Sequence, residues 1–134
     1  MYIKPSDQMS LYEFVPPFEG KLSAENRWVK LAAQIDWQTL ETQYAAHFAQ
    51  SGKAALPFRT AFGALVIKRA LDLSDHQLIA LIRENPYMQY LLGYTQFEDK
   101  IPFSVSSLKL FRQRIPKVAV ARAVKLFKEI CREA

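Results

Sequence analysis

Four polar side chains in the last third of the chain have types and a spacing that suit contact with an anionic or hydrogen-bonding surface. Ser106, Lys109, Arg112 and Gln113 fall on one side of a helix if residues 104–115 are helical. The other side then carries the apolar residues Leu108, Phe111 and Ile115. Hydroxyl, ammonium, guanidinium and amide donors on one exposed face suit phosphate oxygens and base edges in a DNA major groove. An ordinary solvated helix face is the competing interpretation.

Five further residues extend this candidate surface. Ser107 lies beside Ser106 at the expected helix start, where hydroxyls can cap the backbone and contact a phosphate. The others are cations that we expect to touch a DNA backbone: Arg114, Lys117, Arg122 and Lys125.

Other kinds of site have little support in the sequence. The chain has four glycines and no glycine-rich phosphate loop. His47, His76 and Cys131 are scattered and lack the spacing of zinc ligands. Asp72 and Asp75 are interpreted as charges at helix ends. We therefore expect no catalytic residues, no metal or cofactor site and no small-molecule substrate in this chain.

The positive charge of the chain is concentrated at one end. The formal net charge of the 134 residues is +5. Residues 1–100 hold ten Lys or Arg and eleven Asp or Glu, which is a balance of −1. Residues 101–134 hold eight Lys or Arg and two Glu, which is a balance of +6. A basic segment on a neutral body indicates a polyanionic partner, double-stranded DNA first, although a lysine-rich helix can also serve solubility alone.

The composition predicts a globular protein without a membrane span. Half of the residues are hydrophobic, and the longest apolar run, residues 61–67, is far too short to cross a bilayer. The N-terminal residues have no apolar core of the kind found in secretion signals. A single cysteine, Cys131, cannot form an internal disulfide. We expect a cytoplasmic protein, associated with the nucleoid if its partner is DNA.

The apolar pattern follows a helical period, and no segment alternates convincingly as a strand does. The expected fold class is all-α, a compact bundle of six or seven helices with a C-terminal region resembling a helix-turn-helix. The expected organisation is an N-terminal arm over 1–22, a helical domain over 23–116 and a basic amphipathic helix over 117–134. Capping residues and breakers place the expected helices at about 23–35, 36–51, 58–71, 74–84, 86–92, 104–115 and 117–132.

Two of these segments allow more than one interpretation. In the last helix Val120, Val124, Phe127 and Cys131 form an apolar seam, which could pack on this domain, pair with a second copy or lead into a following domain. The aromatic stretch ENPYMQYLLGY, residues 84–94, could be a binding surface. Because it carries no positive charge, we interpret it as packing, with Asn85 and Pro86 restarting a helix.

Three segments of the chain carry recognisable motifs: KLAAQIDWQTLE, the block LPFRTAFGALVIKRALDLSDHQLIALIRENPYMQYLLGY and PFSVSSLKLFRQRI. Together they resemble the N-terminal domain of bacterial insertion-sequence transposases of the IS-five-like group, and the resemblance covers about residues 28–116. It implies a helical domain that binds the terminal inverted repeats of the element during DNA transposition. It also implies that catalysis belongs to a following RNase-H-like domain, whose three acidic residues hold divalent metal such as Mg²⁺. None of those acids is matched by a residue of this chain.

Two other functions are consistent with the same residues. The aromatic helices could form a protein-interaction or dimerisation module, with the basic tail serving solubility. A shortened transposase could instead act as a regulator that competes for the element's ends without cutting them. A homodimer is possible in each case.

Overall fold

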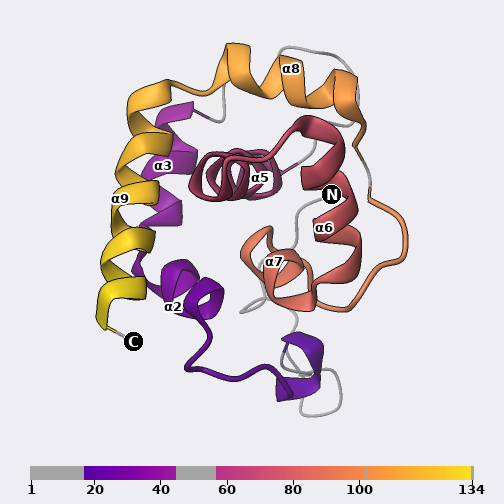
Figure 1. The fold of residues 1–134 in the computed structure, drawn as a ribbon. Coiled ribbons are helices and arrows are strands. Elements are labelled where there is room, and N and C mark those ends of the chain that lie inside the picture. The colour runs from indigo at the N-terminus through magenta and orange to yellow at the C-terminus, as the bar shows by residue number, and fades with distance from the viewer. Residues whose placement is uncertain (1–16, 45–56, 102, 134) are drawn as a thin grey trace.

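The computed structural model describes residues 17–44, 57–101 and 103–133, and these form seven α-helices and a short 3-10 turn without a strand (Figure 1). The predicted all-α fold class is therefore confirmed. Most of the predicted N-terminal arm, the end of the second predicted helix with His47 and the loop after it lie outside the described residues. The elements are η1 (Pro17–Gly20), α2 (Arg27–Gln34), α3 (Trp37–Tyr44), α5 (Phe58–Leu71), α6 (Asp75–Glu84), α7 (Pro86–Leu91), α8 (Val105–Arg114) and α9 (Lys117–Glu133).

Helix α5 is the central element of the fold. It is apolar around most of its circumference, and its residues 60–67 are all buried. Such a helix must be covered on every side. In Figure 1 it is seen nearly end-on in the middle of the molecule, and α3, α6, α7, α8 and α9 all pack against it.

Side-chain caps begin several helices where the sequence predicts them. The carboxylate of Asp36 accepts the backbone N–H of Thr39 at 3.2 Å, at the start of α3. Ser74 and Gln77 form a reciprocal capping box at the start of α6, with Ser74 Oγ accepting the N–H of Gln77 at 3.1 Å. Each cap satisfies backbone N–H groups that have no partner inside the helix.

The predicted start of the first helix at Ser23 is wrong. Helix α2 begins at Arg27, and its cap is Asn26, whose Oδ1 accepts the N–H of Trp28 at 2.8 Å. Ser23 instead closes the preceding turn, where its carbonyl accepts the N–H of Asn26 at 3.2 Å. Asn and Ser are comparably good caps, and here the later one starts the helix.

The stretch at 84–94 is a packing unit. Asn85 Oδ1 accepts the N–H groups of Tyr87 and Met88, and Pro86 occupies the first turn of α7. The fully buried side chain of Gln89 donates to the carbonyls of Ile82 and Glu98 and accepts the N–H of Glu98 at 2.8 Å. These bonds hold α7 and the following loop to α6, so the packing interpretation agrees with the geometry.

Helices α5 and α7 approach one another closely at a glycine. A Cβ atom on Gly63 would lie 3.0 Å from Leu92 Cδ1 and 3.4 Å from the carbonyl oxygen of Leu91, so a larger residue would push the two segments apart. Arg59 then closes the end of α7, donating to the carbonyls of Tyr90 at 2.9 Å and Leu91 at 3.0 Å. Its cationic group is thereby used within the fold.

The apolar seam of α9 packs on the domain itself, the first of the three alternatives. Val120, Val124 and Phe127 are buried, and the ring of Phe127 stacks on Trp28 of α2 at a centroid distance of 4.3 Å. The prediction that Cys131 is the fourth member of the seam is wrong. Cys131 is exposed and Ile130 is buried in its place, although a period of 3.6 residues keeps position 131 close to the direction of Val120.

No helix in the described segments of the chain combines the length and apolar character needed to cross a membrane.

Candidate nucleic-acid interface

Helix α8 carries the N-terminal half of the predicted surface. Ser104 caps it, and Ile115 and Pro116 form the corner between α8 and α9 (Figure 1). Its inner side is buried through Leu108 and Phe111. Packing of this side fixes the rotation of the helix about its axis. As a consequence Ser106, Lys109 and Gln113 are exposed.

The side chain of Arg112 is directed toward α6, at the edge of the exposed face of α8. Its Nη1 donates to Asp75 Oδ1 at 2.9 Å, and Lys68 Nζ lies 3.3 Å from the same oxygen. Burial by itself would raise the pKa of Asp75, but hydrogen bonds from Arg112 and Lys68, and their charges, lower it below the ordinary value of 3.8. One carboxylate thus pairs with two cations, and Arg112 is less available to an outside anion than Lys109.

Two of the residues predicted to contact DNA are partly buried. Ser107 is half-buried, and its Oγ accepts the backbone N–H of Ser104 at 3.2 Å, so its hydroxyl helps to cap α8. Arg114 is also half-buried, at the end of the helix.

The three predicted cations of α9 divide into two groups. Lys117 and Lys125 line hollows on the side of α9 that faces α5. Arg122 is exposed but lines neither hollow.

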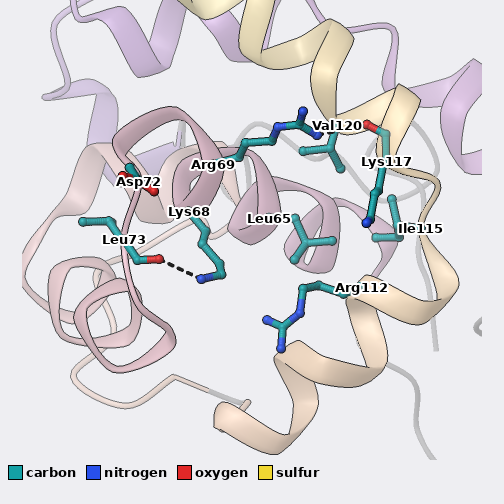
Figure 2. Close-up of a pocket in the computed structure, with 9 residues that line it drawn as sticks. All are labelled: Leu65, Lys68, Arg69, Asp72, Leu73, Arg112, Ile115, Lys117 and Val120. Carbon is teal, nitrogen blue, oxygen red and sulfur yellow. Dashed lines mark hydrogen bonds between the residues drawn. The ribbon is translucent and has the colours of Figure 1, made fainter.

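Two adjoining hollows form what we call the basic groove, between the C-terminal half of α5, the end of α8 and α9. The first has a volume of about 390 Å³ and the second about 330 Å³, and Arg69 lines both. Figure 2 shows the first, with the charged ends of Lys68 and Arg112 turned into the same space and Arg69 extending toward α9. The cations that line the groove are Lys68, Arg69, Arg112, Lys117, Lys125, Lys128 and Arg132, and the acids are Asp72 and Glu129.

Four lining cations were not among the residues predicted for the site: Lys68, Arg69, Lys128 and Arg132. Lys128 and Arg132 had a sequence signal, because they continue the basic side of α9 from Lys125 at helical steps. Lys68 and Arg69 had none, since basic residues in the last turn of a helix are ordinarily explained by the helix dipole. Their place beside α9 is a property of the tertiary fold.

Among the described residues, no three His, Cys, Asp or Glu side chains gather where they could hold a metal ion.

Comparison with known proteins identifies the family. Residues 16–114 match the family described as "Transposase domain (DUF772)", which is more than half of the chain. The chain therefore belongs to this transposase domain family. It is also similar to "Uncharacterized protein ORF8 in nfe locus" of Rhizobium meliloti, with 30% identity over 87 residues, 65% of this chain. The chain spans 42% of the length of that relative. No solved structure matches.

Proposed function

We propose that this chain is the DNA-binding domain of a transposase, recognising the terminal inverted repeats of an insertion sequence. Its role in transposition is recognition of the element's ends, and strand cleavage belongs to a metal-dependent domain that these residues do not form. Exposed donors of α8, Ser106, Lys109 and Gln113, face base edges and phosphates in this proposal. The cations Arg114, Lys117, Arg122 and Lys125 contact the backbone.

One observation carries the proposal. In a member of a transposase domain family, the segment that holds the excess positive charge folds into two helices with most of their cations exposed. Lys109, Lys117, Arg122 and Lys125 have no ion-pair partner within the described residues. Uncompensated surface cations raise the local potential and attract a polyanion.

The packing of α9 weighs against the dimerisation alternative. The apolar seam that could have paired two copies is covered by α2 and α5 of the same chain. A dimer through that seam would require α9 to leave its own core.

The proposal is tested by binding a randomised duplex library and sequencing what is retained. We expect enrichment of a sequence that also occurs at the ends of the element encoding the protein. The double variant Lys109→Ala/Gln113→Ala should lose about 1–3 kcal/mol of preference for that sequence while keeping most of its affinity for unselected DNA. Both side chains are exposed, so the variant should keep its helical circular dichroism. Failure of the unmodified protein to bind any duplex would end the proposal.

A further inference from the structure

The second hollow of the basic groove holds a higher density of unpaired positive charge than the first. It is lined by Arg69, Lys125, Lys128 and Arg132 against a single acid, Glu129, which is a local balance of +3. None of the four cations has an ion-pair partner within the described residues. In the first hollow, by contrast, Lys68 and Arg112 are both ion-paired with Asp75.

The uncompensated charges come from two helices that are distant in sequence. Arg69 is in the last turn of α5, and it lies beside α9 with its Nη1 3.5 Å from the carbonyl oxygen of Lys117. A single hydrogen bond of that length leaves most of the five guanidinium donors free for a ligand. Like charges held together in one groove repel each other, and an anion between them removes the repulsion.

The shape of the groove fits an extended anion. Small residues, Ala121 and Val124, line it between the cations, so its floor is not filled by a bulky side chain. Lys125, Lys128 and Arg132 follow the axis of α9 at steps of three and four residues, which keeps them on one side. From Lys117 to Arg132 the helix rises about 22 Å, which is long enough to meet several consecutive phosphates of one strand.

We propose that the basic groove between α5 and α9 binds the phosphodiester backbone of one DNA strand, with Arg69, Lys125, Lys128 and Arg132 as phosphate contacts. The inference rests on the proposed function, and it separates two roles within it. The outer face of α8 reads sequence, whereas the groove supplies affinity that is independent of sequence.

The test compares three triple variants by their affinity for a random-sequence duplex at several salt concentrations. The groove variant is Arg69→Gln/Lys128→Gln/Arg132→Gln. The matched control, Lys21→Gln/Arg83→Gln/Lys100→Gln, removes the same charge from exposed positions outside the groove. The third variant, Arg69→Lys/Lys128→Arg/Arg132→Lys, keeps the charge of the groove.

We expect the groove variant to lower the slope of log affinity against log salt by about 2 to 3, with equal losses for selected and unselected DNA. The matched control should change the slope by less than about 1, and the charge-conserving variant should keep it. An effect of the groove variant no larger than that of the control overturns the inference and leaves the proposed function standing. A charge-conserving variant whose salt slope falls as far as that of the groove variant would likewise overturn the inference and leave the proposed function standing. Absence of duplex binding by the unmodified chain overturns both.

Discussion

At the scale of single residues, Arg59 shows a cation used for structure and not for binding. Its guanidinium donates to two carbonyls at the end of α7 and lies over the ring of Trp37 at 4.7 Å. Burial lowers its pKa from the ordinary value of 12.5, with an opposing effect from Tyr90. A lysine cannot reproduce this fork of planar donors.

We therefore expect Arg59→Lys to lower the free energy of unfolding by about 1–3 kcal/mol, measured by urea denaturation. The matched control is Arg83→Lys, because Arg83 also donates to a carbonyl, that of Asp99, but at an exposed position. The control substitution should lower the free energy of unfolding by less than about 0.5 kcal/mol. Equal losses in the two variants would mean that the enclosed setting of Arg59 does not matter.

Tyr94 is a residue whose hydroxyl costs the fold free energy. Its Oη is buried and has no hydrogen-bond partner in the described segments of the chain. Burial, with a smaller effect from Glu98, raises its pKa from 10.0 to about 12. Removing an unsatisfied buried hydroxyl is neutral or stabilising, so Tyr94→Phe should unfold at the same or a higher temperature, with a gain of about 0–2 kcal/mol.

The raised pKa of Tyr94 also predicts how the stability of the protein changes at alkaline pH. Between pH 10 and about 12 the unfolded chain loses the Tyr94 proton while the folded chain keeps it, so unfolding is favoured as the pH rises. Tyr94→Phe lacks this effect. Its stability advantage over the unmodified protein should therefore grow across that interval in denaturation curves, and a constant difference would contradict the assignment.

At the scale of elements, Asn85 joins two helices. Its backbone N–H bonds to Ile82 at the end of α6, and its side chain accepts the first N–H groups of α7 from Tyr87 at 2.9 Å and Met88 at 3.2 Å. Replacement by alanine leaves those groups without a partner. We expect Asn85→Ala to cost about 1–2 kcal/mol of unfolding free energy, and Asn85→Asp, which keeps the acceptor and adds a charge favoured at a helix start, to cost much less. Comparable losses in thermal denaturation would show that the cap is not the source of stability.

The helices were predictable to the extent that local signals decide them. The bounds of α5, Phe58 to Leu71, match the expected ones, because the apolar run ends where Asp72 takes a left-handed conformation. Local signals failed where two of them competed, as Ser23 and Asn26 do before α2. They also failed for Cys131, which continues the apolar period of α9 from Val120 and is nevertheless exposed near the end of the helix.

The candidate site was predictable only in its local features. Exposure of Lys109 and Gln113 follows from the apolar period of α8. The bond from Arg112 to Asp75 joins residues 37 positions apart, and the groove brings Arg69 to residues beyond position 116. The order of residues in the sequence does not predict these two contacts, because they depend on how α5, α6, α8 and α9 pack against one another.

At the scale of the whole molecule, Asp75 connects three helices through charge. It begins α6 and holds Lys68 of α5 and Arg112 of α8, with 19% of its side chain exposed. Since its pKa is lower in the folded than in the unfolded chain, the interaction contributes stability above the ordinary pKa of 3.8. That stability is lost as the pH falls through the lowered folded-state pKa.

The substitution Asp75→Asn tests this connection. At neutral pH we expect it to reduce the free energy of unfolding by about 1 kcal/mol, a modest value because Arg112 is 41% exposed and solvent screens the pair. The deficit should shrink as the pH is lowered below 3.8, because protonation removes the same charge from the unmodified protein. Asp72→Asn is the matched control: Asp72 is exposed, and asparagine tolerates its φ of +53°. A deficit for Asp75→Asn that is equal to that of the control, or that does not vary with pH, would mean that packing alone holds α5, α6 and α8 together.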